Sequence, residues 1–476
     1  MAVLAEARPY HARWSVVNGE FLEFVERNPA CLDRSSFASL YQEPSLRKFS
    51  IQPWPFFVGS EAHRRMGEIA LGMDRLVKAA IERFLRHDPR TITEFYRTHD
   101  NLDGSPLMGI DLNETLVALL AAPPNGIASA PSRADYIETA DGLRMIEHNA
   151  GGVLGGLQTD AIGRLHLAAE PTARFLRERG RRVRPPEILR LLFRHVVEDT
   201  VRLGAWRGGD FTVAMVVRPL DPDRVAMHSA EAYTWHLRQA LEACGVPAEG
   251  RVLLCGYDEL VPERGTITLE GHRVHAVVEQ HDGQGDVRAV FRAFKSGTVN
   301  LFSGPITALL NDKRNLVLLS AHAGSDDFTA AERELIERHL PWTRGVVPGR
   351  TTFRGRPLRI PEDLGDHREE MVLKKASSIG GAFVVVGRYR TPEQWTHDVA
   401  RAVWEEDWVI QEYQESVPYC FQSGSEAVRH DMIWGLFTFG DRFGGAFLRL
   451  APAGRADGRV NGLQGAEVGV VLEVDG

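Results

Sequence analysis

The sequence predicts a mixed α/β and α+β fold. Three observations carry this prediction: apolar residues at helical spacing near the N-terminus, a strand–helix–strand pattern in the middle, and a cluster of strands in the last third. The chain has 476 residues, of which 43% are hydrophobic and 25% are charged, as in ordinary globular proteins. Length alone suggests about three folding units, and the sequence pattern divides the chain into four.

The first unit is expected to be helical and to cover residues 1–130. A long helix is predicted from Ser60, which stands at an N-cap position, to about Arg86. Its apolar residues recur at helical spacing, so we assign the helix to packing. A second unit, residues 131–208, begins with a hairpin, because Asp141-Gly142 separates two semi-apolar runs.

The third unit is expected to be a small α/β subdomain covering residues 209–345. A buried strand at 211–217 precedes a helix capped by Ser229, and a second strand follows at 252–254. Strand, helix and strand in this order predict a parallel pair. A hairpin is predicted for residues 266–278.

The last unit, residues 346–476, is expected to form one antiparallel sheet with a covering helix. The helix begins at Thr391 as N-cap and Pro392 at the first helical position. The predicted strands are residues 371–374, 383–386, 408–411, 433–439 and 445–450.

Composition excludes several classes of protein. No apolar run approaches the roughly 20 residues of a membrane span, and the N-terminus does not resemble a secretory signal. The 4 cysteines are scattered, which argues against a disulfide framework and fits a reducing cytoplasm. The net charge of −8 offers no basic surface for nucleic acid. We therefore expect a cytoplasmic protein without membrane or nucleic-acid partners.

Oxygen-bearing side chains mark the predicted hairpin. Glu147 and Asn149 are two residues apart, so on a strand they face the same side, and Asp135 lies on the partner strand. Two carboxylates and an amide suit Mg²⁺. A solvated sheet face is the alternative interpretation.

Three further segments could contact a nucleotide. Lys374 ends a strand before a small-residue loop containing Gly380 and Gly381, which could cradle phosphates or form an ordinary hairpin loop. The strand that ends in Gln411, Glu412 and Tyr413 could offer edge groups to a purine or simply meet solvent. Lys313 follows a short helical pattern, where it could contact ATP or only complement the helix dipole.

Taken together and in this order, these segments resemble the circularly permuted ATP-grasp ligases. The similarity is greatest to the synthetase domain of the glutathionylspermidine synthase family, and it runs from about Arg133 to Val471. The carboxylate segment precedes the lysine-and-glycine segment, which is the order of the permuted family. Further matches support it: Asn311-Asp312-Lys313, Pro341-Trp342-Thr343-Arg344, Val409 to Tyr413, Gly435-Leu436-Phe437 and Arg449.

The resemblance implies a role for each segment. Asp135, Glu147 and Asn149 would hold two Mg²⁺ ions on the ATP phosphates, and Arg133 would stabilise the transferred phosphoryl group. The remaining residues would bind ATP: Lys313 and Lys374 at the phosphates, Gly380 and Gly381 over them, and Gln411, Glu412 and Tyr413 along the adenine.

The implied activity is ATP-dependent joining of a carboxylate to an amine through an acyl phosphate, with release of ADP and phosphate. The sequence departs from the family at Lys375, where proline is frequent, and residues 1–133 carry no amidase-like Cys/His pattern. The substrates could be small molecules, peptides or a carrier-bound acyl group. A non-catalytic nucleotide-binding scaffold and a small-molecule kinase are the alternative functions, and the oligomeric state is not readable from the sequence.

Overall fold

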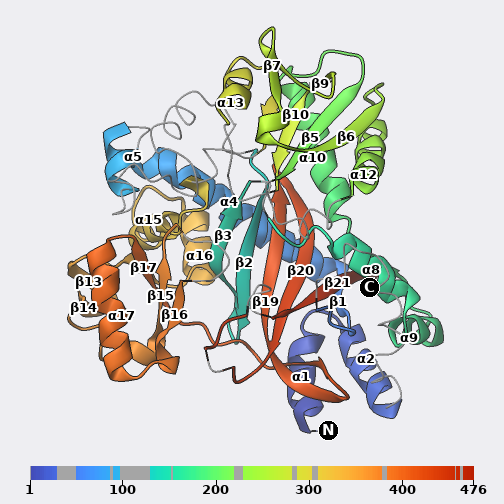
Figure 1. Cartoon of the computed structure of the whole chain (residues 1–476). Coiled ribbons are helices and arrows are strands. Elements are labelled where there is room, and N and C mark those ends of the chain that lie inside the picture. The colour runs from blue at the N-terminus through green and yellow to red at the C-terminus, as the bar shows by residue number, and fades with distance from the viewer. Residues whose placement is uncertain are drawn as a thin grey trace.

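Figure 1 shows the computed structural model of the chain. The residues that it describes are 2–28, 50–85, 89–96, 129–151, 154–218, 229–280, 287–302, 309–377, 383–455, 457–460 and 465–475. Among them, no helix is long and apolar enough to cross a membrane.

The centre of the molecule is a large sheet built from both ends of the chain. Its strands run in the order β1 (Phe56–Gly59), β21 (Glu467–Val474), β20 (Arg442–Pro452), β19 (Glu426–Phe439), β2 (Ser132–Thr139) and β3 (Gly142–Ala150). Two short strands join it, β18 (Tyr419–Ser423) beside β19 and β4 (Val183–Arg184) beside β21. The hairpin predicted around Asp141-Gly142 is therefore confirmed as β2 and β3, and it lies at one edge of this sheet.

Helices pack on this sheet and extend beyond it (Figure 1). The long helix expected from Ser60 is α4 (Ser60–Leu85), which buries its apolar side chains against β19 and β20. The other helices that the structure describes before residue 203 are α1 (Ala2–Ala12), α2 (Val16–Arg27), α5 (Pro89–Phe95), α8 (Thr159–Ala168), α9 (Thr172–Arg179) and α10 (Ile188–Arg202). The amphipathic pattern of α4 thus reports core packing, as expected.

The five strands predicted in the last third divide between two sheets, so the expectation of one sheet is wrong. β19, β20 and β21 belong to the large sheet, whereas a separate antiparallel sheet has the order β12 (Thr343–Gly345), β17 (Trp408–Glu412), β15 (Met371–Lys375) and β16 (Val384–Val386). Helix α17 (Pro392–Glu405) packs on it through Trp395, and Thr391 caps this helix as predicted. Strand pairing over long sequence separations decides this division, and local patterning does not encode it.

The α/β unit contains the expected parallel pair. β5 (Phe211–Arg218) and β6 (Gly250–Gly256) are parallel, with α12 (Ala230–Ala243) between them in sequence and Ser229 as its N-cap. The sheet order is β11 (Asn300–Leu301), β10 (Ala276–Glu279), β5 and β6. The hairpin predicted for 266–278 is only partly correct: β8 (Thr266–Leu269) pairs with β9 (His272–Val274), but Ala276 begins β10 of the parallel sheet.

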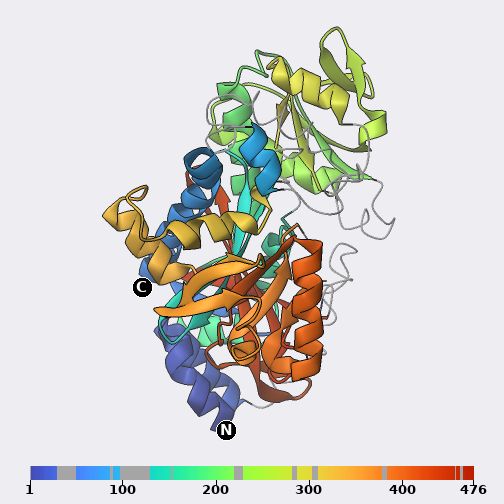
Figure 2. The same cartoon turned by 90° about the vertical axis from the view of Figure 1, so that its left-hand side faces the viewer.

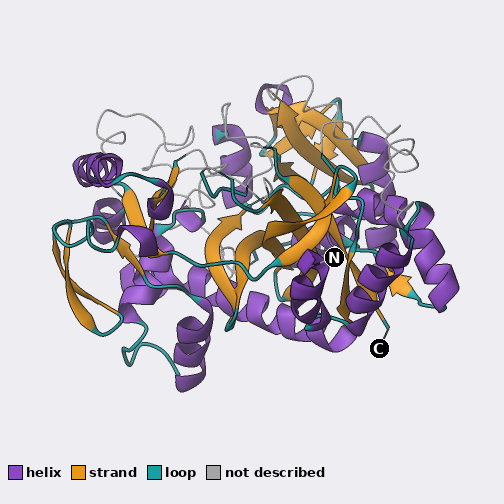
Figure 3. Ribbon diagram, turned by 90° about the horizontal axis from the view of Figure 1, so that it is seen from below, coloured by secondary structure: helices purple, strands orange, loops and turns teal. Residues whose placement is uncertain are grey.

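Within the described part of the chain, further elements are β7 (Val261–Glu263), α13 (Arg288–Lys295), α15 (Arg314–His322), α16 (Ala330–His339), β13 (Gly349–Phe353) and β14 (Arg356–Ile360). Short 3₁₀ turns are η3 (Tyr257–Glu259), η4 (Arg368–Glu370) and η5 (Gly387–Tyr389). In Figure 2 the α/β unit lies at the top and the β12–β17–β15–β16 sheet faces the viewer. Figure 3, from below, shows the N-terminal helices beside the large sheet.

A buried carboxylate forms hydrogen bonds with the N-terminal end of α10. The two carboxylate oxygens of Asp160, on α8, accept hydrogen bonds from the backbone N–H groups of Ile188 at 2.8 Å and Leu189 at 3.0 Å. These N–H groups have no partner within the helix. We expect Asp160→Ala to lower the free energy of unfolding by about 1–2 kcal/mol, measured by urea unfolding. An unchanged urea midpoint would contradict this role.

A second buried carboxylate makes stability depend on pH. Glu138 accepts hydrogen bonds from Trp14 Nε1 and the Tyr419 hydroxyl, and it lies 3.5 Å from Arg13. Burial raises the pKa of Glu138 from 4.5 to about 7, although the Trp14 and Arg13 contacts act in the opposite direction. The folded state therefore favours the protonated acid, so this group's contribution is greatest below pH 4.5 and declines as the pH rises towards 7.

We expect Glu138→Gln to remove this decline, because the amide does not ionise. Between pH 5 and pH 8 the wild type should lose up to about 3 kcal/mol more unfolding free energy than the variant. Urea unfolding at the two pH values measures this difference, and equal losses in the two proteins would show that Glu138 does not titrate there.

Candidate functional site

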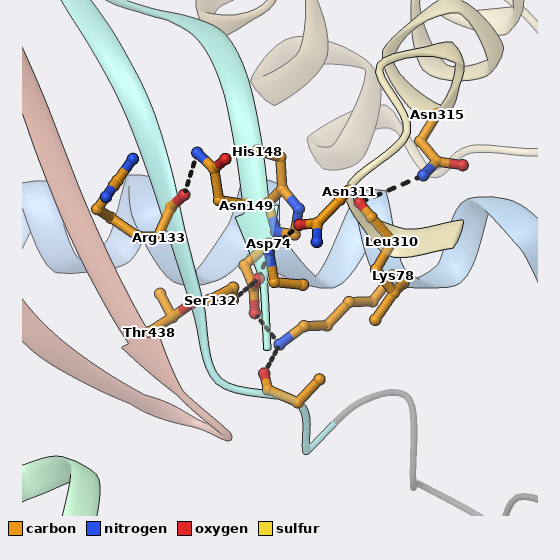
Figure 4. Close-up of polar contacts among 12 residues, drawn as sticks. Asp74, Lys78, Ser132, Arg133, His148, Asn149, Leu310, Asn311, Asn315 and Thr438 are labelled. Atoms are coloured by element: carbon orange, nitrogen blue, oxygen red, sulfur yellow. Dashed lines mark hydrogen bonds and ion pairs between the residues drawn. The ribbon is translucent and has the colours of Figure 1, made fainter. Parts of the chain in front are cut away.

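The β2–β3 hairpin brings the four residues predicted at its centre to one face. Asp135 is the direct cross-strand partner of Glu147, and Arg133 is the partner of Asn149. The side-chain amide of Asn149 lies 3.5 Å from Asp135 Oδ2. It also lies 3.4 Å from the Arg133 carbonyl oxygen (Figure 4). A register irregularity follows Asp135 in this pair of strands. The spacing argument from the sequence is thus confirmed for the geometry, while the metal-binding role of these residues stays a prediction.

Asp135 is fully buried between two arginines. Arg133 donates from Nε to Oδ1 at 3.0 Å, and Nη2 of Arg449, from β20, lies 2.5 Å from Oδ2. Burial alone would raise the pKa of Asp135, but the two guanidinium groups outweigh it and lower that pKa. Asp135 is therefore ionised at neutral pH and joins the two arginines.

An aromatic ring supports the same two arginines. The guanidinium carbons of Arg133 and Arg449 lie 5.3 and 5.9 Å from the centre of the Phe447 ring. The ring lies where a side chain at Gly435 would stand, because a Cβ built there would overlap it. Glycine at 435 thus provides the space in which Phe447 holds the arginines.

Sequence reasoning assigned no role to Arg449. One feature of the sequence could have drawn attention to Arg449: it is a single arginine in the apolar run 446–450. Alternation along a strand places it on the same face as Phe447. That pattern shows a shared face, but the partner Asp135 lies on another strand far away in sequence.

Two buried lysines approach the hairpin from other parts of the chain. Lys313 Nζ lies 3.1 Å from Glu147 Oε1, and Lys374 Nζ donates to the backbone carbonyl of Ile146 at 2.9 Å. Lys374 also donates to Gln411 Oε1 at 2.7 Å. Burial, and to a smaller extent the charge of Lys313, lowers the pKa of Lys374 to about 8, while Glu147 acts in the opposite direction. The carboxylate hairpin and the lysine from the last third therefore share one site.

A short segment before α15 connects the two parts of the site. The Asn311 side-chain oxygen accepts the backbone N–H of Ala150 at the end of β3 (Figure 4). The backbone N–H of Lys313 donates to the carbonyl of Ala376, just beyond β15, at 3.0 Å. Lys313 also immediately precedes α15, where the helix dipole disfavours a cation. Its position is therefore better explained by the anionic Glu147 than by the dipole considered from the sequence.

Two of the predicted adenine-contacting residues, Gln411 and Glu412, lie on the internal strand β17, and Tyr413 directly follows it, so the expectation of an open strand edge is wrong. β17 pairs with both β12 and β15. The backbone N–H groups of Glu412 and Tyr413 donate to the carbonyls of Trp342 and Glu370. The buried Gln411 side chain joins Lys374 to the Thr343 hydroxyl.

The outer side chains of this strand are held by arginines. Glu412 pairs with Arg354 at 2.7 Å, and the Arg388 guanidinium lies 3.9 Å from the centre of the Tyr413 ring. Contact of Gln411, Glu412 and Tyr413 with adenine stays a prediction. Gly380 and Gly381 lie outside the described residues.

The side-chain oxygens of the hairpin are of the kind that binds Mg²⁺, but both carboxylates already form ion pairs, Asp135 with two arginines and Glu147 with Lys313. Within the described ranges, no three His, Cys, Asp or Glu side chains are grouped to hold a metal ion. Glu147 and Asn149 offer hard oxygen ligands on one face, and the Glu147 side chain is 22% exposed. Asp135 is 1% exposed and is occupied by the two arginines. Glu147 and Asn149 therefore fit the ion better than Asp135 does.

The fold has a solved counterpart. A glutathione synthetase-like effector from Globodera pallida, in its apo form, matches with a TM-score of 0.56 at 12% sequence identity. The match covers 92% of this chain and 98% of that one. The chain shares the fold of this effector. The mixed α+β architecture is thus consistent with an ATP-grasp-like fold. No protein-family profile and no curated protein matches the sequence.

Proposed function

We propose that the protein is an ATP-dependent carboxylate–amine ligase of the circularly permuted ATP-grasp type, most similar to the glutathionylspermidine synthase family. One observation carries the proposal. Four cations gather around two carboxylates: Arg133 and Arg449 pair with Asp135, Lys313 pairs with Glu147, and Lys374 donates to the backbone carbonyl of Ile146 beside Glu147. The excess of positive charge suits a polyanion such as a triphosphate.

Each residue has a defined task in this proposal. Glu147 and Asn149 hold Mg²⁺, which supplies charge neutralisation and orientation of the phosphates. Asp135 can become a third Mg²⁺ ligand only if Arg133 or Arg449 leaves it to contact the phosphoryl group. Lys313 and Lys374 bind phosphate oxygens.

The reaction needs positioning and charge more than covalent assistance from the protein. A substrate carboxylate oxygen attacks the γ-phosphorus of ATP, and ADP leaves. The amine nitrogen then attacks the carbonyl carbon of the acyl phosphate, phosphate leaves, and the nitrogen loses a proton. Arg133 and Arg449, held by Asp135 and Phe447, stabilise the charge that develops on the transferred phosphoryl oxygens.

The proposed substrates are a small or peptide carboxylate, or a carrier-bound acyl group, and an amine. A screen of carboxylic acids against amines, read by coupled ADP release, tests the reaction. The expected result is ADP and phosphate only when both substrates are present, with Glu147→Gln as an inactive control of nearly the same shape.

Three other outcomes would overturn the proposal. AMP and pyrophosphate would exclude the acyl-phosphate route. A stable phosphorylated acid without ligation would indicate a kinase. MgATP binding without turnover in any combination of substrates would indicate a scaffold.

A further inference from the structure

A buried polar cluster lies on the opposite side of the hairpin from the proposed site. It consists of Asp74 and Lys78 on α4, Ser132 on β2, His148 on β3 and Thr438 on β19, and we call it the α4 cluster (Figure 4). All five residues are at most 4% exposed.

Asp74 is the centre of the α4 cluster. Its Oδ1 accepts hydrogen bonds from the Ser132 hydroxyl and from His148 Nε2, the latter at 2.8 Å. Its Oδ2 accepts from Lys78 Nζ at 2.7 Å, and Lys78 also donates to the backbone carbonyl of Ala130. The Asp74 carboxylate on α4 is therefore hydrogen-bonded to both strands of the hairpin. Through Lys78 it is also linked to Ala130, two residues before β2 begins.

Hydrophobic packing alone does not need this arrangement. The rest of the α4 face in the core is apolar, including Met66, Met73 and Val77. Burying an ion pair gives little net stability compared with apolar residues of similar volume. Burial would raise the pKa of Asp74, yet Lys78 and His148 lower it to about 2, so Asp74 stays ionised at neutral pH. The cluster's hydrogen bonds are satisfied in only one relative placement of the helix and strands, so it fixes that placement even though it adds little stability.

The elements that the α4 cluster joins are those that carry the proposed site. His148 lies between Glu147 and Asn149, and side chains alternate along a strand, so its contact with Asp74 orients both neighbours towards the opposite face. Ser132 immediately precedes Arg133 and also contacts the Thr438 hydroxyl at 2.7 Å. The cluster thus fixes residues adjacent to the candidate metal ligands and to an arginine of the site.

We propose that Asp74, Lys78, Ser132 and His148 are positioning residues, which set the orientation of Glu147 and Asn149 for the metal–nucleotide complex. This inference rests on the proposed function. It requires that replacing His148, which removes its hydrogen bond to Asp74, weakens Mg²⁺-dependent nucleotide binding. Replacing a comparable buried histidine elsewhere should weaken it less.

The test compares His148→Leu, His148→Gln and His11→Leu in the full chain. Gln can place an N–H group near the position of Nε2, whereas Leu cannot. His11 is a matched control, because it is also buried and its Nε2 accepts the backbone N–H of Cys420 on β18. Its ring packs against Phe56, Tyr419 and Phe421, none of which belongs to the proposed site. Calorimetric titration measures MgATP affinity, repeated at several Mg²⁺ concentrations, and thermal unfolding measures stability.

We expect His148→Leu to weaken MgATP binding about tenfold and to require more Mg²⁺ for half-maximal binding, with His148→Gln recovering most of the loss. His11→Leu should lower the unfolding temperature without changing either quantity. In a Glu147→Gln background, His148→Leu should have no further effect on the Mg²⁺ requirement.

The outcomes separate this inference from the proposed function. If the wild type binds MgATP and His148→Leu binds it equally well at every Mg²⁺ concentration, the positioning role is wrong and the proposed function stands. If His11→Leu weakens binding as much, the effect is general destabilisation and the positioning role is also wrong. If His148→Leu does not fold, Ser132→Ala provides the same comparison through the other strand. No MgATP binding by the wild type overturns both.

Discussion

Replacing Lys374 with methionine is expected to weaken ATP binding by about 10- to 150-fold, the equivalent of about 1.5–3 kcal/mol for a hydrogen bond to a charged group. In the proposed complex the Lys374 ammonium leaves Ile146 and Gln411 and contacts phosphate. Calorimetric titration with MgATP measures the affinity. Stability should not fall with it, because burial disfavours the charged form of Lys374 and methionine removes that cost.

The neighbouring lysine provides a control on the opposite face of the same strand. Lys375 lies 3.3 Å from Asp407 and 3.7 Å from Glu405, away from the hairpin. Lys375→Met should therefore leave nucleotide affinity within about twofold of the wild type, because alternation along β15 directs its ammonium to Asp407 and Glu405 and not to the proposed site. Equal losses in the two variants would show that Lys374 has no specific role.

The same lysine implies a pH dependence. Because the pKa of Lys374 is about 8, its ammonium loses the proton as the pH rises above that value. Wild-type affinity for MgATP should then decline between pH 8 and pH 9, and Lys374→Met should not show this decline. Titrations at the two pH values test the difference.

Substituting Gly435 with alanine is expected to have the second largest effect. The added methyl group would overlap the Phe447 ring, so the ring must move and the two arginines that it supports must move with it. Overpacking of this kind costs about 1–3 kcal/mol of unfolding free energy. Turnover should fall further than stability explains, at a temperature where the variant is folded, because Arg133 and Arg449 are displaced.

Gly349→Ala is the matched control for this substitution. Gly349 is an exposed strand residue, and the nearest atom to a Cβ there would be the Val347 carbonyl oxygen at 3.9 Å. It should retain wild-type turnover. Wild-type turnover in Gly435→Ala would mean that the ring does not position the arginines.

Local patterns in the sequence were sufficient to predict several elements and part of the site. The helical spacing after Ser60 predicted α4, and the Asp-Gly turn predicted β2 and β3. The two-residue spacing of Glu147 and Asn149 correctly placed them on one face, because the strand repeat is independent of the rest of the fold.

Pairing between distant segments could not be predicted in this way. The separation of β15 and β17 from β19 and β20 depends on which strands meet in three dimensions. For the same reason the internal position of β17 and the pairing of Arg449 with Asp135 were missed. The contact of His148 with Asp74 was also missed, because Asp74 belongs to a helix that the sequence analysis assigned to packing alone.

Hydrogen exchange with and without MgATP tests most directly whether a triphosphate binds between the hairpin and the lysine-bearing strand. We expect slower exchange in three segments, residues 145–150, 311–316 and 372–377, and unchanged exchange in β5 and β6 of the α/β unit. Protection confined to other parts of the chain, or no protection at saturating MgATP, would contradict the proposed site.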